Sequence, residues 1–144
     1  MGPILGSDLP YEIGELHELI SLKIIGFKFT SLPASFGNLT KLQQLTLSSG
    51  LLEEVPNCFY SMPFLETIDF SYTNIADLPD SICSQKNLRE LSINNTKITQ
   101  LPWRIGDLTS LKKLNISNTE ITILPESIYK LKLETFLREG LPLE

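Results

Sequence analysis

Apolar residues recur along this chain with a period of 23 residues. The stretch LPWRIGDLTSLKKLNISNTEITI, residues 101–123, shows the pattern most fully. Related stretches begin at Leu9, Leu32, Val55 and Leu78, and a sixth begins at Leu124 and then decays. A fixed period of this length is typical of a solenoid, in which successive coils of chain stack on one another.

Within each repeat the spacing between apolar residues changes from three to two. Ile105, Leu108 and Leu111 are three apart, which predicts one side of a short helical turn. Leu114 and Ile116 are two apart, which predicts a short strand with one buried face. A proline recurs once in each repeat, as Pro10, Pro33, Pro56, Pro79, Pro102 and Pro125. Because proline fixes φ and has no N–H, it suits an arch or the start of a helical turn.

One such coil has too few inward apolar side chains to offset the entropy of ordering its backbone. The coils become stable when they stack and share their buried faces. The strands would then form a parallel sheet on one face, with the helical turns on the other. Because strands lie about 5 Å apart and helices about 10 Å apart, the stack is predicted to curve with the sheet on the inside.

The pattern LPxxIxxLxxLxxLxLxxTxI resembles the 23-residue LPxxIxxL subclass of the leucine-rich repeat family. This subclass occurs in Ras-binding and polarity scaffolds, plant intracellular immune receptors, and bacterial surface or effector proteins. The resemblance implies an α/β solenoid: a right-handed horseshoe arc with a parallel sheet on the concave face and short helical or 3-10 turns on the convex face. It also implies an N-terminal segment at 1–8, a repeat domain at 9–137 with repeats starting at 9, 32, 55, 78, 101 and 124, and a tail at 138–144.

The chain departs from the family pattern in three places. After the strand, where the family usually has Asn, the column reads Phe27, Gly50, Thr73, Thr96 and Thr119. The threonines are predicted to keep a ladder of hydroxyl hydrogen bonds along the stack, while the first two coils must satisfy these carbonyls differently. Gln85 replaces a leucine on the helical side, which predicts a local weakness or a water site. The last repeat slips at Leu133 and ends in a segment that resembles a degenerate closing coil.

Composition and charge narrow the function classes. With 144 residues, 42% of them hydrophobic, the chain is one globular domain in size. The net charge of −5 argues against nucleic acid or an anionic membrane as the main partner. No apolar run approaches the ~20 residues of a membrane span. The opening residues lack the features of a signal peptide. These features favour a cytoplasmic location, with export as an effector or surface protein as the alternative.

The two cysteines are expected to be free thiols. Cys58 and Cys83 lie in neighbouring repeats but are offset by two positions. This offset adds several ångströms to the strand spacing and carries the pair beyond the ~7 Å that a disulfide allows. Unpaired cysteines are typical of a reducing compartment.

The strand positions that flank the two buried strand residues are predicted to point out of the concave sheet in three columns. The first column is Ser21, Gln44, Thr67, Glu90 and Lys113. The second column is Lys23, Thr46, Asp69, Ser92 and Asn115. The third column is Ile25, Ser48, Ser71, Asn94 and Ser117, and beside it run Gly26, Ser49, Tyr72, Asn95 and Asn118.

Most side chains of this surface are small and polar. Its four charged residues are predicted to form a solvated mesh of ion pairs, and they are Lys23, Asp69, Glu90 and Lys113. It suits hydrogen bonding to a protein or peptide partner, and Tyr72 supplies its only aromatic ring. The predicted partner contacts are Lys23, Gln44, Thr46, Thr67, Asp69, Tyr72, Glu90, Ser92, Asn94, Lys113 and Asn115. The alternative is a solvated sheet face that binds nothing.

A second candidate contact lies on the arch. Trp103 and Arg104 follow a proline, and Trp103 stands in a column that is otherwise mostly polar. A lone tryptophan in such a column indicates an interface residue. The alternative is a ring lying flat over neighbouring convex side chains. Leu51, in a column of polar residues, is expected to be exposed.

Catalytic chemistry finds little support in the sequence. His17 and Cys58 are two coils apart, roughly 10 Å or more on the stack spacing, whereas a nucleophile and its base need ~3 Å. Asp69 and Glu90 face the same way, but an open face offers no water exclusion and too few metal ligands. We therefore expect no enzyme, no cofactor and no bound metal.

Two hypotheses remain. The first is a non-enzymatic module that binds a protein partner on its concave face and is a monomer. The second is the repeat region of a larger effector, receptor or surface scaffold whose activity lies elsewhere. Exposed apolar coil ends and self-association would favour the second.

Overall fold

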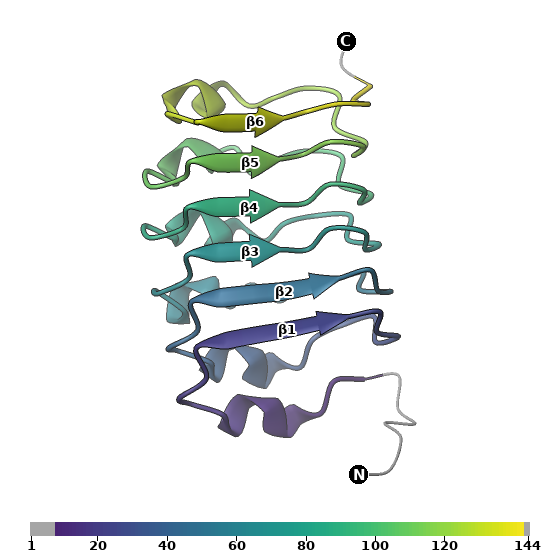
Figure 1. The fold of residues 1–144 in the computed structure, drawn as a ribbon, viewed down its shortest axis with the longest axis vertical. Helices are drawn as coiled ribbons and strands as arrows, with labels where there is room; N and C mark the ends of the chain where they lie inside the picture. The colour runs from purple at the N-terminus through teal and green to yellow at the C-terminus, as the bar shows by residue number, and fades with distance from the viewer. Residues whose placement is uncertain (1–7, 143–144) are drawn as a thin grey trace.

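The computed structural model describes residues 8–142 and shows an open parallel sheet with a row of short helices behind it (Figure 1). Its strands are β1 (Ser21–Ile25), β2 (Gln44–Ser48), β3 (Thr67–Asp69), β4 (Glu90–Ser92), β5 (Lys113–Asn115) and β6 (Thr135–Leu137). They lie side by side in chain order, so each coil contacts its neighbours in sequence. The predicted N-terminal segment, apart from Asp8, and the last two residues of the predicted tail lie outside the described residues.

The sheet register reproduces the sequence period. Leu45 pairs with Ile68, which lies 23 residues later, and the same shift holds from β1 to β5. The last step is one residue shorter, because Leu114 pairs with Phe136. The predicted slip at Leu133 is thus a one-residue deletion that precedes β6. We number the coils 1 to 6, beginning at Leu9, Leu32, Val55, Leu78, Leu101 and Leu124.

Each coil carries one 3-10 helix opposite its strand, which confirms the predicted helical turns. These helices are η1 (Tyr11–Glu15), η2 (Ala34–Asn38), η3 (Phe59–Ser61), η4 (Asp80–Ser84), η5 (Ile105–Asp107) and η6 (Glu126–Lys130). An extended proline stands directly before four of them, at Pro10, Pro33, Pro79 and Pro125. None of the helices in this part of the chain is long and apolar enough to cross a membrane.

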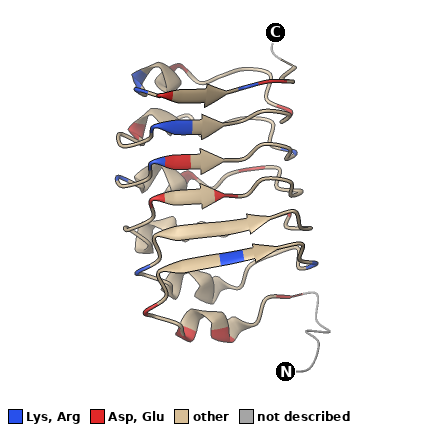
Figure 2. Cartoon of the chain, viewed as in Figure 1, with Lys and Arg blue, Asp and Glu red and all other residues tan. Residues whose placement is uncertain are grey.

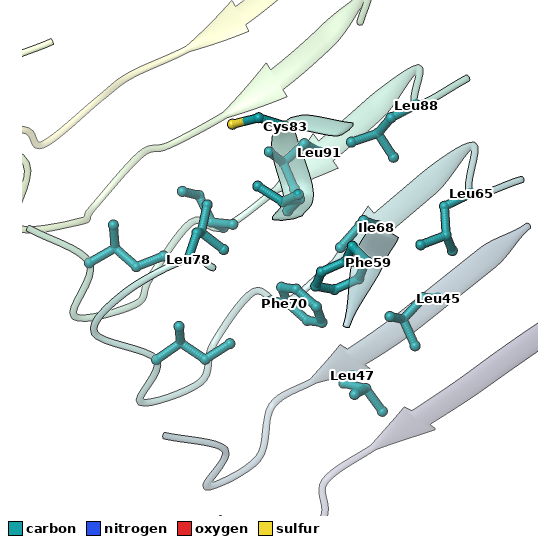
Figure 3. Packing of buried hydrophobic residues seen from close by; sticks show 14 of the residues in the cluster. Leu45, Leu47, Phe59, Leu65, Ile68, Phe70, Leu78, Cys83, Leu88 and Leu91 are labelled. Carbon is teal, nitrogen blue, oxygen red and sulfur yellow. The ribbon is translucent and has the colours of Figure 1, made fainter. Parts of the chain in front are cut away.

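The inward leucines, isoleucines and phenylalanines form one cluster between the sheet and the helices. Phe59 of η3 and Phe70, which follows β3, pack with their ring centroids 6.5 Å apart (Figure 3). Leu22 and Phe136, in the edge strands β1 and β6, are only partly buried. An edge strand has one neighbour where an inner strand has two, so burial is deepest in coils 2 to 5.

The threonine column closes individual coils rather than linking them. Thr73, Thr96 and Thr119 each donate from Oγ1 to the carbonyl three residues earlier, at 2.7, 2.8 and 2.9 Å. The prediction of a ladder along the stack was therefore wrong. A threonine hydroxyl is shorter than an asparagine amide, and it reaches only the backbone of its own coil.

An aromatic pair takes the place of this hydrogen bond in the first coil. Phe27 stacks on Phe29 with ring centroids 4.0 Å apart. The ring of Phe27 lies against the next coil at Gly50, where a Cβ atom would stand 2.5 Å from the ring. The glycine therefore gives the ring its space. The first two coils differ from the rest, as the sequence predicted.

Gln85 is fully buried on the helical side of coil 4. Its Nε2 donates to the carbonyl oxygen of Phe59 in coil 3, at 2.6 Å. Its Oε1 has no hydrogen-bond partner among the described residues. A buried acceptor without a partner costs ~1–3 kcal/mol, so this oxygen is the place for the predicted weakness or water site.

Candidate functional site

The first two predicted columns lie on the open side of the sheet. Strand pairing places the members of each column next to one another from β1 to β5. The exposed members are Ser21, Lys23, Gln44, Glu90 and Lys113, and the half-buried members are Thr46, Thr67, Asp69, Ser92 and Asn115. We call these ten residues, together with Tyr72, the strand face.

The third predicted column is mostly covered. Its serines are at most 8% exposed, namely Ser48, Ser71 and Ser117, and Asn94 is half-buried. The side chains of Asp69 and Asn115 fold back over the strand ends, where their Oδ1 atoms accept from the N–H groups two residues on, at 2.8 and 3.1 Å. These three serines therefore offer little surface to a partner. Only Ile25, in the edge strand β1, is well exposed, at 56%.

The chain turns sharply beside the third column, with a positive φ in each of the first five coils. The residues and angles are Gly26 (75°), Ser49 (54°), Tyr72 (57°), Asn95 (57°) and Asn118 (55°). Glycine and asparagine adopt this conformation readily, whereas a tyrosine does so rarely. The glycine and asparagines of the column are a signal of this turn that the sequence alone carries. Ser49 and Tyr72 are the exceptions, and the side chain of Tyr72 is 58% exposed.

The charges of the strand face are only partly paired. Lys113 Nζ lies 3.2 Å from Glu90 Oε1 across neighbouring strands, where Figure 2 shows blue beside red at the starts of β5 and β4. Within residues 8–142, Asp69 and Lys23 form no ion pair, so the predicted mesh is reduced to one pair. An exposed pair of this kind contributes only ~0–1 kcal/mol. Its charges can therefore be drawn to a partner at little cost to the fold.

The arch residues around Trp103 stand free of the convex surface. Trp103 is 72% exposed, so it does not lie flat over its neighbours. The guanidinium carbon of Arg104 is 5.8 Å from the ring centroid, and Arg104 is paired with Asp107 at 2.7 Å. Leu51 is 47% exposed, as the sequence predicted. Trp103 and Arg104 thus remain available for contact.

Both cysteines are free, as predicted, and both are partly withdrawn from solvent. Burial raises the pKa of the Cys58 and Cys83 thiols from 9.0 to about 11. Both thiols are therefore protonated at neutral pH, and a protonated thiol is a poor nucleophile. Among residues 8–142, no group of three or more His, Cys, Asp and Glu side chains could hold a metal ion.

The raised thiol pKa values predict a loss of stability in alkali. The unfolded chain releases the thiol protons at lower pH than the folded chain. The stability that the two buried, protonated thiols contribute is therefore fully present below pH 9 and falls as the pH rises towards 11. We expect the melting temperature to drop less over this range for the Cys58→Ser/Cys83→Ala variant than for the wild type. Circular dichroism at a series of pH values measures it. An equal drop in both proteins would show that the thiols play no part.

Comparison with known proteins gives a consistent result. A family profile described as "Leucine Rich repeats (2 copies)" matches residues 63–108 and 86–132. No curated protein gives a significant match. A solved leucine-rich repeat protein of Leptospira interrogans, LIC12759, is 26% identical with a TM-score of 0.68, and the match covers 93% of this chain and 40% of that chain.

Two further solved structures are also similar. The PEPR1–AtPEP1 structure is 26% identical with a TM-score of 0.81, over 93% of this chain and 20% of that chain. The plant peptide hormone receptor RGFR1, in complex with RGF2, is 25% identical with a TM-score of 0.79, over 93% of this chain and 22% of that chain. The chain thus spans less than half the length of each of these proteins.

The matches agree with the geometry. The chain repeats every 23 residues, adds one parallel strand and one 3-10 helix per coil, and leaves its sheet open. This architecture is typical of modules that recognise other proteins. The chain is a leucine-rich repeat solenoid, and its residues 63–132 match the profile of that family.

Proposed function

We propose that the chain is a non-enzymatic recognition module that binds a protein or peptide partner on the strand face. The observation that carries this proposal is the conformation of Tyr72. A left-handed backbone costs a residue other than glycine roughly 1–2 kcal/mol, and the exposed ring of Tyr72 gains little burial to offset it. Strained residues of this kind cluster at functional sites.

The surroundings of Tyr72 support the same proposal. Its N–H donates to the carbonyl oxygen of Asn94 at 3.0 Å, so the strained turn is fixed to the next coil. Tyrosine is enriched among the residues that dominate binding energy. On the same face, Glu90 is paired with Lys113, whereas Asp69 forms no ion pair within residues 8–142. A fixed aromatic ring on the same face as this unpaired carboxylate is suited to a partner with apolar and basic groups.

The similar structures add a further argument. PEPR1–AtPEP1 and RGFR1 with RGF2 are complexes, and RGFR1 is described as a peptide hormone receptor. A stack of coils of this shape is therefore compatible with peptide binding. The strand face has a rigid backbone, because its strands pair on both sides in coils 2 to 5. A rigid surface loses little conformational entropy when it binds.

Capture from a lysate of the source cell with three baits tests the proposal. The first bait is the wild type, and the second is a strand-face variant, Asp69→Lys/Glu90→Lys. The third is an arch variant, Glu54→Lys/Asp77→Lys, which changes the net charge by the same amount. We expect the wild type and the arch variant to retain one partner that the strand-face variant loses. Loss by both variants would indicate that net charge alone governs capture.

Tyr72→Asn provides the second test, and it does not depend on charge. Asparagine favours the left-handed turn, so the melting temperature should stay equal or rise. We expect the Kd for the captured partner to weaken by about thirtyfold, as for a central interface tyrosine. Isothermal titration measures it. Unchanged affinity in this folded variant would show that Tyr72 does not contact the partner. The proposal would then lose its main support.

A further inference from the structure

A groove runs along the arches, where the chain passes from the end of each strand to the next helix. It consists of three hollows with volumes of about 110, 540 and 180 Å³. The first and second share Glu54 and Val55, and the second and third share Asp77 and Leu78. Trp103 lines the far end of the third hollow. We call this series the arch groove.

The arch groove has a floor of mixed polar and apolar surface, and the repeat itself generates the apolar part. Each coil contributes an apolar residue followed by proline, namely Val55–Pro56, Leu78–Pro79 and Leu101–Pro102. Leu78 and Leu101 are buried beneath it, and Figure 3 shows Leu78 on the arch that leads to the helix bearing Cys83. Proline has no N–H to offer a ligand. The apolar part of the floor can therefore contact the alkyl groups of a ligand.

The rim of the groove is acidic. Its charged residues are Glu53, Glu54, Asp77, Asp80 and Lys97, all of them exposed, so four carboxylates face one ammonium group. None of the four carboxylates takes part in an ion pair within residues 8–142. An unneutralised acidic rim repels nucleic acid and anionic lipid, and it attracts cations.

Trp103 marks the end of the acidic section. A hollow of about 570 Å³ begins on its other side, lined by Arg104, Asp107, Glu126 and Lys130. Those two cations and two anions balance, so the preference for positive charge stops at the tryptophan. The exposed indole ring can itself hold a cation over its face.

We propose that the arch groove binds an extended, basic segment of a partner protein. Lysine and arginine side chains suit it for two reasons, because their alkyl stems can lie on the apolar part of the floor while their charged ends reach the acidic rim. An extended chain suits it because the hollows follow one another across several coils. The groove is separate from the strand face, so this second surface can act whether or not the strand face binds a partner.

A synthetic peptide tests this proposal directly. The probe is a fluorescent peptide of alternating lysine and alanine, with a glutamate–alanine peptide as its counterpart, and binding is followed by fluorescence anisotropy at low and at physiological salt. We expect the wild type to bind the lysine peptide alone. The arch variant Glu54→Lys/Asp77→Lys should bind it about tenfold more weakly, and Trp103→Ala should weaken binding as well.

The variant Glu12→Lys/Glu15→Lys is the matched control, since it carries the same net charge as the arch variant and its two exposed sites lie on η1, outside both the arch groove and the strand face. We expect it to bind the lysine peptide as the wild type does. Equal weakening in both variants would overturn the proposal, because net charge would then explain the binding. The proposal would also be overturned if the wild type did not bind the lysine peptide, or if the Trp103→Ala variant and the arch variant both bound it as tightly as the wild type. These outcomes leave the capture experiment on the strand face unaffected.

Discussion

Leu114→Ala is expected to lower the free energy of unfolding by ~2–5 kcal/mol. Leu114 is 1% exposed and pairs with Leu91 on one side and Phe136 on the other. Truncation removes its own burial and leaves a cavity that both neighbouring coils border. In a stack where each coil contacts only its neighbours, the shared faces hold the array together. Urea unfolding followed by circular dichroism measures the loss.

Leu51→Ala is the matched control for this prediction. It removes the same atoms from a leucine that is 47% exposed, and surface changes of this kind usually alter stability by no more than ~0.5 kcal/mol. A loss below about 1 kcal/mol for Leu114→Ala would mean that the buried strand column is misplaced. If Leu51→Ala lowered the free energy of unfolding as much as Leu114→Ala, the side chain of Leu51 would have to be buried, in contrast to its exposed position in this structure.

Gly106→Ala is expected to destabilise the chain by ~1–3 kcal/mol through overpacking. A Cβ atom at Gly106 would stand 2.2 Å from the backbone oxygen of Ser127 in the next coil. Two hydrogen bonds tie Ser127 closely to coil 5, because its Oγ donates to the carbonyl oxygen of Trp103 and accepts from the N–H of Gly106. The backbone of coil 6 must therefore move away from coil 5. Thermal and urea unfolding measure the cost.

Gly37→Ala is the comparison within the same column of glycines. There the nearest atoms are side-chain atoms, the Cβ of Cys58 at 3.0 Å and the Oγ of Ser61 at 3.1 Å. A few tenths of an ångström relieve this contact, so the loss should be clearly smaller than for Gly106→Ala. If Gly37→Ala proved the more damaging substitution, the close approach of coils 5 and 6 would be contradicted.

The architecture could be predicted from the sequence because it depends on a repeated local rule. The spacing of Ile105, Leu108 and Leu111 gives the helical turn, and that of Leu114 and Ile116 gives the strand. A constant period then determines the strand register without knowledge of any contact. The deletion before β6 is visible in the same way, as a break in the period.

The details of the surface could not be predicted because they depend on side-chain direction. The period gives Ser71 and Thr67 equivalent places beside the buried column, but Asp69 folds over Ser71 and leaves Thr67 accessible. The repeat pattern likewise does not tell whether the Thr73 hydroxyl donates to a carbonyl of its own coil or of the neighbouring coil. In the structure it donates within its own coil. The left-handed turn was the exception, since Gly26 and Asn118 in one column already signal it.

The arch groove escaped prediction for a related reason. Glu54 and Asp77 occupy one column, which the sequence shows, but the sequence does not show that the arches leave a hollow between them. The hollow depends on how closely neighbouring arches pack. Volume between coils is a property of the stack and has no counterpart in a single repeat.

The affinity of the captured partner for the two charge-matched variants tests the central claim most directly. Isothermal titration compares the wild type, the strand-face variant Asp69→Lys/Glu90→Lys and the arch variant Glu54→Lys/Asp77→Lys. If the strand face is the binding site, the strand-face variant loses at least about tenfold in affinity and the arch variant changes by less than about twofold. The reverse order, with the arch variant impaired and the strand-face variant intact, would contradict the claim.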